Sequence, residues 1–195
     1  MKKILLFAFL LIGTASFGQS KDALKNIKEV TFYGVDYSHV GIIGADESSY
    51  KFIETFTKIN ELMQREYSKY VKPLAKKTKV DILGVDLAPV NAANNKITTQ
   101  TLNRSSNVAA IEEPAIKEIL NKLDFQRNEG YGVILIAEEL NKSHNKGIYE
   151  LVFFDVATKD IVTHAKISGK SRGFGLRNFW ANSIHKAISK IKLSK

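Results

Sequence analysis

Three glycines and three basic residues lie close together near the carboxyl end of the chain, in the segment ISGKSRGFGLRNFWANSIHKAISKIK, residues 167–192. The triplet GKS within this segment is how a phosphate-binding P-loop ends. The full P-loop motif also needs a glycine five residues before the glycine of that triplet, and this chain has His164 there. The segment is therefore not a nucleotide-binding P-loop, although its residue types still favour binding of an anion.

The segment has the features of an anion-binding turn that leads into a helix. Glycines permit positive φ and a close approach of the backbone, and the first amides of a helix have no intrahelical partner. The residues expected to surround the anion are Lys170, Arg172, Gly173, Gly175 and Arg177. The alternative is a tight strand-to-helix turn that only packs its aromatic side chains onto the protein.

A second candidate site consists of carboxylates. The segments VTFYGVDYSHV and VDILGVDLAPV share Gly-Val-Asp, which places Asp36 and Asp86 at the carboxyl ends of two predicted strands. Glu138 or Glu139 would close a third strand. Open α/β sheets bind ligands at this edge, and carboxylates there could hold a metal cation or act as an acid/base pair. The alternative is that each aspartate ends its strand by binding its own loop backbone.

The remaining residue types do not form a recognised catalytic set. The four histidines have no zinc-ligand spacing, and no G-x-S-x-G motif marks a serine nucleophile. We therefore expect no catalytic residues and no cofactor, and the only candidate metal ligands are Asp36 and Asp86.

Hydrophobic periodicity predicts the elements that position these residues. Alternating or continuous apolar stretches predict strands over 30–36, 80–87, 132–140, 148–156 and 160–168. An apolar stripe predicts a long helix from an N-cap at Asp46 to near Val71, where Pro73 is expected to stop it. Glu113-Pro114 opens a short helix, and a last helix runs from Leu176 to Ile191. Residues 88–111 are expected to form a long loop.

The order of these elements, β-α-β-α-β-β-β-α, predicts an α/β (α+β) protein with a single mixed sheet and helices packed on it. The first strand, helix and strand form a βαβ unit, so the two strands should be parallel with a right-handed crossover. The turn ATKD between two alternating stretches indicates an antiparallel hairpin.

The amino terminus predicts export from the cytoplasm. Lys2 and Lys3 precede the apolar run ILLFAFLLI and a small-residue cleavage site, which is the layout of a signal peptide over residues 1–18 cleaved after Gly18. The run is too short to span a membrane, which takes about 20 residues. We expect residues 19–195 to form one α/β domain that is periplasmic or secreted, with no transmembrane segment. The chain has no cysteine, so it has no lipid anchor and no disulfide.

The positive charge is interpreted chiefly as a contribution to solubility, because the basic residues are mostly scattered lysines, and it also raises the chance of an anionic partner. Lys and Arg number 29 against 20 Asp and Glu, which gives a net charge of +9. An exported protein seldom meets nucleic acid, so we expect a non-enzymatic cell-envelope protein that binds a partner protein or an anionic lipid or glycan. One alternative is a metal-assisted hydrolase that uses Asp36 and Asp86. Another is a membrane-surface binder through the basic C-terminal helix, which carries Trp and Phe.

The segment LVFFDVATKDIVTHAKISGKSRGFGLRNFWANSIHKAI resembles the carboxyl half of a family of uncharacterised exported bacterial proteins. The likeness lies in its F-F-D-x-x-T turn and its G-x-G-x-R-N-x-W helix start. The order of elements also resembles the α/β module at the amino end of the TolB periplasmic protein and of curli-secretion lipoproteins, whose lipid-bearing cysteine this chain lacks. These resemblances imply an exported α/β protein and supply no catalytic residues.

Overall fold

One mixed sheet organises the part of the chain that the computed structural model describes, residues 23–104 and 106–192. Its strands are β1 (Glu29–Asp36), β2 (Gly41–Ile43), β3 (Asp81–Val85), β4 (Tyr131–Asn141), β5 (Lys146–Asp155) and β6 (Ile161–Lys170). The strand order is β3-β1-β4-β5-β6, and β2 pairs with β4. The predicted signal peptide, residues 1–18, lies outside the described residues.

The strand directions confirm the predicted fold class. β1 is parallel to both of its neighbours, β3 and β4. β4, β5 and β6 are antiparallel to one another in turn. The sheet is therefore mixed, with a parallel part built around the βαβ unit and an antiparallel part built around the hairpin.

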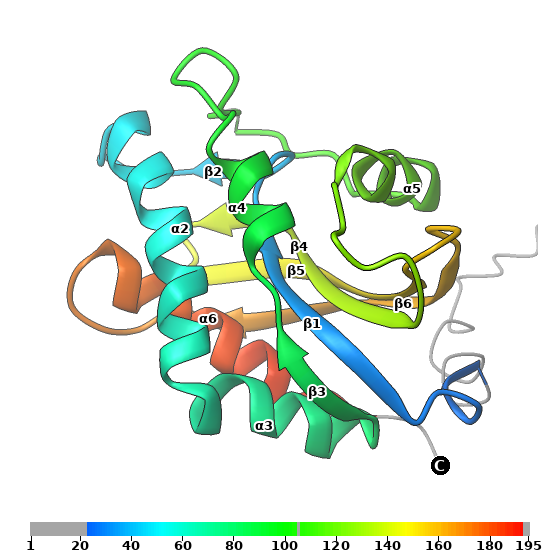
Figure 1. Cartoon of the computed structure of the whole chain (residues 1–195). Helices are drawn as coiled ribbons and strands as arrows, with labels where there is room; N and C mark the ends of the chain where they lie inside the picture. The colour runs from blue at the N-terminus through cyan, green and yellow to red at the C-terminus, as the bar shows by residue number, and fades with distance from the viewer. Residues whose placement is uncertain (1–22, 105, 193–195) are drawn as a thin grey trace, which may run out of the picture.

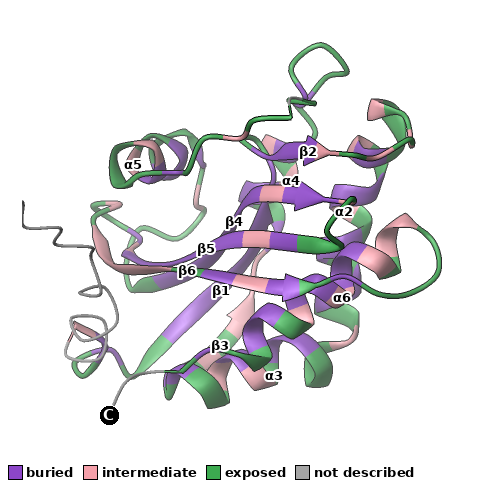
Figure 2. Ribbon diagram, turned by 180° about the vertical axis from the view of Figure 1, so that it is seen from behind, coloured by how far each residue is buried: buried purple, intermediate pink, exposed green. Residues whose placement is uncertain are grey.

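Helices cover both faces of the sheet (Figure 1). They are α2 (Ser49–Arg65), α3 (Tyr67–Thr78), α4 (Ala88–Asn94), α5 (Glu113–Lys122) and α6 (Leu176–Ser189). The apolar residues of α2, α3 and α6 share one core cluster, and those of α5 belong to a second cluster. Strand β4 lies between the two layers, because Val133 and Leu135 join the first cluster while Ile134 and Ile136 join the second. Figure 2 shows this strand buried along most of its length.

The single long helix predicted after residue 46 is two helices. Ser48 rather than Asp46 is the N-cap of α2, since its side-chain oxygen accepts a hydrogen bond from the Lys51 amide at 3.4 Å. Glu66 leaves the helical conformation, with φ −95° and ψ 48°, and separates α2 from α3.

The prediction that Pro73 ends this helical segment is wrong. Pro73 lies inside α3, which continues to Thr78. A proline removes only one backbone hydrogen bond from a helix, and the buried side chains of Val71 and Leu74 on either side of it hold α3 against the core.

Residues 88–111 are not wholly a loop, which corrects the prediction. The short helix α4 begins this segment, with Pro89 in its first turn, and buries Val90 and Asn94. Residues after Val40, for which no element was predicted, form the three-residue strand β2. Both elements were missed because each is too short to show a hydrophobic period.

Helix α6 packs unusually close to the hairpin at two glycines. Gly147 of β5 and Gly169 of β6 lie opposite each other in the sheet. A Cβ at Gly169 would clash with the Ser183 carbonyl oxygen of α6 and lie 2.5 Å from the Ala187 nitrogen. A Cβ at Gly147 would lie 2.6 Å from the Ser183 hydroxyl. The position of α6 therefore depends on the absence of side chains at this pair.

We expect Gly169→Ala to lower the free energy of unfolding by about 2 kcal/mol or more, because the added methyl group would press on helix backbone that cannot move independently. Gly84→Ala is the matched control, since a Cβ at Gly84 of β3 has nothing within 4 Å. The control should change stability by about 1 kcal/mol at most. Urea denaturation of the three proteins measures the difference, and equal losses for both variants would contradict the packing described.

Candidate functional site

Asp36 ends β1 in a buried position and binds its own loop. Its Oδ1 accepts hydrogen bonds from the Ser38 amide at 2.9 Å and the Ser38 hydroxyl at 2.5 Å. Its Oδ2 is buried without a hydrogen-bond partner among the described residues. Burial raises the pKa of this carboxyl above its ordinary value, against the two Ser38 hydrogen bonds, which lower it.

Asp86 follows β3 and also binds its own loop, where its Oδ1 accepts a hydrogen bond from the Ala88 amide at 3.1 Å. The parallel register pairs Phe32 with Val85, and the Asp86 amide donates to the Phe32 carbonyl at 3.0 Å. Asp86 is thus level with the residue after Phe32, three positions before Asp36, or roughly 10 Å along the strand. The sheet therefore does not bring the two aspartates side by side.

A joint metal site for Asp36 and Asp86 remains a prediction that none of these contacts supports. Within the described residues, no group of three or more His, Asp or Glu side chains is arranged to hold a metal ion. Glu139 accepts a hydrogen bond from the Asn141 side chain at 3.1 Å. Glu138 belongs to a different cluster, described below.

The predicted anion-binding residues gather at one end of the molecule, between β6 and α6. Lys170 ends β6, Arg172 lies with Gly173 and Gly175 in the turn, and Arg177 lies in the first turn of α6. A depression of about 370 Å³ beside the turn is lined by Arg172 and Arg177, and by residues of α2, α3 and α6 that include Lys69, Tyr70, Asn178 and Asn182. Of the five predicted residues, Arg172, Gly173 and Arg177 line this depression, whereas Lys170 and Gly175 do not.

A second basic turn lies against the first and was not predicted to belong to the site. The Ser171 amide donates to the Asn145 carbonyl at 2.8 Å, which joins the β4–β5 turn to the turn after β6. This contact sets Lys146 directly opposite Lys170 in the antiparallel register. We call the four residues Lys146, Lys170, Arg172 and Arg177 the basic end.

Among the described residues, the basic end has no ion-paired carboxylate of its own, and Glu66, which lines the depression beside it, pairs with Lys69 at 2.9 Å. None of its four residues forms an ion pair with another residue of the described ranges. Arg177 donates only to the neighbouring Asn178 side chain, at 3.1 Å. Like charges placed opposite each other in a sheet destabilise it, so a bound anion would stabilise this end of the protein.

The apolar side of the last helix is buried in the core, which counts against the alternative that this helix lies on a membrane surface. Trp180, Ile184 and Ile188 are fully buried in the core beside β6. Within residues 23–104 and 106–192, no helix is both long and apolar enough to cross a lipid bilayer. Any surface contact of this region must come from the turn before α6 rather than from the helix face.

A row of charged side chains, of which the two carboxylates are buried, crosses β4, β5 and β6 on the face of the sheet that α5 covers. The Lys166 ammonium lies 2.7 and 3.0 Å from the two carboxylate oxygens of Glu138 and 3.6 Å from Glu150. Glu138 also accepts the Ile111 amide, at 2.8 Å. His164 lies 3.2 Å from Glu150 through its Nδ1 atom. We call Glu138, Glu150, His164 and Lys166 the charge row.

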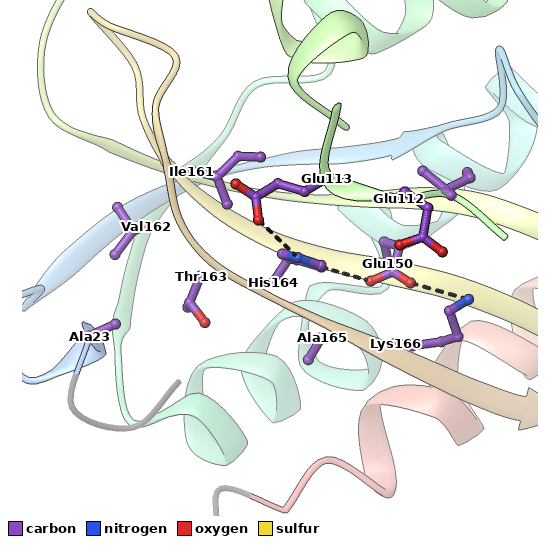
Figure 3. A pocket seen from close by; sticks show the side chains of 11 residues that line it. Ala23, Glu112, Glu113, Glu150, Ile161, Val162, Thr163, His164, Ala165 and Lys166 are labelled. Carbon is purple, nitrogen blue, oxygen red and sulfur yellow. Dashed lines mark hydrogen bonds and ion pairs between the residues drawn. The ribbon is translucent and has the colours of Figure 1, made fainter. Parts of the chain in front are cut away.

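The charge row forms part of the wall of a cavity of about 570 Å³ (Figure 3). His164 lies between Glu150 and Glu113, whose carboxylate is 4.0 Å from its Nε2 atom. Burial raises the pKa of Glu150, against the His164 hydrogen bond and the Lys166 charge, which lower it. Burial alone would lower the pKa of Lys166, but its hydrogen bonds to Glu138 outweigh this and raise it. Each residue of the charge row thus has a charged partner. These contacts link β4, β5 and β6 to one another and to the segment before α5.

We expect Lys166→Met to lower the free energy of unfolding by about 2–3 kcal/mol, because it leaves two buried carboxylates without their cation. This decrease in the free energy of unfolding should be smaller than for breaking a fully buried ion pair, since the Lys166 side chain is 45% exposed. The control is Lys122→Met, whose pair with Glu118 is exposed to solvent and should contribute little to stability. Guanidinium denaturation compares them, and a loss at Lys166 no larger than that at Lys122 would show that the row is not structural.

The pH dependence of stability tests the buried state of Asp36. Because its folded pKa is raised, the carboxyl stabilises the fold fully below its ordinary pKa of 3.8, and this contribution is lost as the pH rises through the folded pKa. Asp36→Asn does not titrate, so its stability relative to the unmodified protein should increase with pH above about 3.8. Denaturation at several pH values measures this, and a difference that stays constant with pH would contradict it.

No family model matches the sequence, and no curated protein matches it. Among solved structures, the chain is similar to a variant PelC dodecamer from Paraburkholderia phytofirmans. The two are 12% identical, the match covers 85% of this chain and 93% of that chain, and the TM-score is 0.30. A likeness of this size carries no argument about function.

Proposed function

We propose that the protein is a non-enzymatic binder of an anionic cell-envelope component, a phosphate- or carboxylate-bearing lipid or glycan, and that the basic end makes the contact. The observation that carries this proposal is the Lys146–Lys170 pair, held opposite each other by the sheet register without a carboxylate partner among the described residues. Arg172 in the adjoining turn and Arg177 in the first turn of α6 add two further positive charges at this end of the molecule, beside the depression.

The energetics favour an external anion over an internal partner. Two other cations near the sheet have carboxylates close by, since Lys142 has Glu47 at 2.9 Å and Lys166 has Glu138 at 2.7 Å. The basic end instead keeps repelling charges together, which costs about 0.2–1 kcal/mol for a cross-strand pair. An anion bound from solution would offset the charge repulsion at the basic end.

The predicted export signal supports an envelope ligand, because a periplasmic or secreted protein meets acidic lipids and glycans. The competing hydrolase hypothesis needs Asp36 and Asp86 at one site, and the register separates them. A partner protein remains an alternative of the same binding class, in which an acidic peptide would take the place of the lipid or glycan.

The test measures binding of the mature protein to inorganic polyphosphate, a soluble polyanion without acyl chains. Lys170→Gln together with Arg172→Gln should weaken binding by about 2 kcal/mol, or roughly 30-fold, at about 1 kcal/mol for each basic residue near an anionic surface. The matched control removes two exposed lysines elsewhere, Lys28→Gln with Lys96→Gln. It lowers the net charge equally and should weaken binding much less.

Added salt should weaken binding of the unmodified protein and reduce the difference between the two double variants, since salt screens exposed charges. Equal weakening by both double variants would mean that only net charge matters, and it would overturn the proposal of a local site. Binding that neither variant weakens would overturn it as well.

A further inference from the structure

We infer that the anionic component is the surface of an acidic lipid bilayer, and that Phe174 inserts into its interfacial region. This inference rests on the proposed function and assigns Phe174 a role beyond it. Phe174 belongs to the turn between β6 and α6, and this turn is the orange loop that projects at the left of Figure 1. Its side chain is 96% exposed, the most exposed large apolar side chain of the described residues.

The backbone holds Phe174 in this outward position. Gly173 has φ +129° and Gly175 has φ +74°, and both values are strained for any residue with a side chain. Gly175 is also the N-cap of α6, and its carbonyl accepts a hydrogen bond from the Phe179 amide at 3.0 Å. The two glycines thus form a tight turn with one large apolar residue between them, fixed to the end of a packed helix.

The surroundings of Phe174 fit a bilayer interface better than a glycan. No ring of the described residues stacks on Phe174 or lies edge-on to it. Phe174 and Tyr70 both line the depression beside the turn, but Tyr70 is buried whereas Phe174 is almost wholly exposed. An exposed apolar side chain is stabilised only when something covers it. Acyl chains at a membrane surface cover such a side chain, whereas a hydrated polysaccharide covers it poorly.

The basic residues lie where lipid phosphates would be. Arg172 is two positions before Phe174 and Arg177 is three positions after it, and both line the depression beside the turn with Lys69. An inserted aromatic ring with cations around its base is the arrangement that binds acidic bilayers, because apolar burial and headgroup attraction add. Since the apolar face of α6 is buried, insertion is limited to the turn and binding should be reversible.

The first test compares vesicles made of equal parts phosphatidylglycerol and phosphatidylcholine with vesicles of phosphatidylcholine alone. The mature protein should sediment with the acidic vesicles only. Phe174→Ala should weaken this binding about tenfold or more, and the control Leu83→Ala, which removes a side chain 59% exposed on β3, should not. Phe174→Ala should leave polyphosphate binding unchanged.

The second test places a reporter in the bilayer. Phe174→Trp adds a second tryptophan to the buried Trp180, the only one in the chain. On acidic vesicles, fluorescence of this variant should shift to shorter wavelength and be quenched by brominated acyl chains. The unmodified protein, whose Trp180 is 0% exposed, should show neither change.

The outcomes separate the two proposals. If Phe174→Ala binds acidic vesicles as the unmodified protein does, or if Phe174→Trp is not quenched, insertion is overturned while anion binding at the basic end can stand. If Lys170→Gln with Arg172→Gln fails to weaken polyphosphate binding more than its control, the proposed function fails first. Equal sedimentation with both kinds of vesicle would overturn the requirement for acidic lipid.

Discussion

The close approach of helix α6 to the Gly147–Gly169 pair is the constraint on which the candidate binding surface depends. It lets the Ser183 hydroxyl reach the buried Tyr149 hydroxyl at 2.6 Å, which fixes the helix against β5 and β6. Because α6 is fixed, its N-terminus and the turn before it are fixed too. The same two glycines lie next to Lys146 and Lys170 in their strands. One packing contact thus sets both the helix position and the spacing of the basic residues.

The charge row supports the opposite face of the sheet by a different physical means. Removing two carboxylates and an ammonium from water costs free energy, and only close pairing of these charges offsets that cost. The pairing here requires three strands in one register, together with the Ile111 amide from the segment before α5. An apolar row could pack as tightly, but it would not specify this register. The row therefore contributes to the uniqueness of the arrangement more than to its stability.

Polar side chains replace backbone hydrogen bonds where the pairing of β1 with β4 is interrupted, close to Asp36. The register with β4 shifts between Phe32 and Val35. Asn60 of α2 accepts from the Val35 amide at 2.8 Å and donates to its carbonyl at 3.0 Å, and Asn94 of α4 donates to that carbonyl as well. Two buried amides thus anchor both helices to the central strand and leave Asp36 in its buried position at the strand end.

Alternation and helical periodicity in the sequence determined the strands, the last helix and the mixed sheet, because burial of a face imposes a period on the residues. They also determined the basic turn after residue 169, which is contiguous in the chain. The pairing of Lys146 with Lys170 follows from the hairpin turn and its register. Glu138 continues the alternation of Ile134 and Ile136 and so lies on the face that α5 covers, but its pairing with Lys166 was not predicted, because β4 and β6 are separated by β5 in the sheet. The offset of Asp36 from Asp86, the burial of the α6 face and the exposure of Phe174 were decided only by tertiary structure, since each depends on contacts between segments distant in sequence.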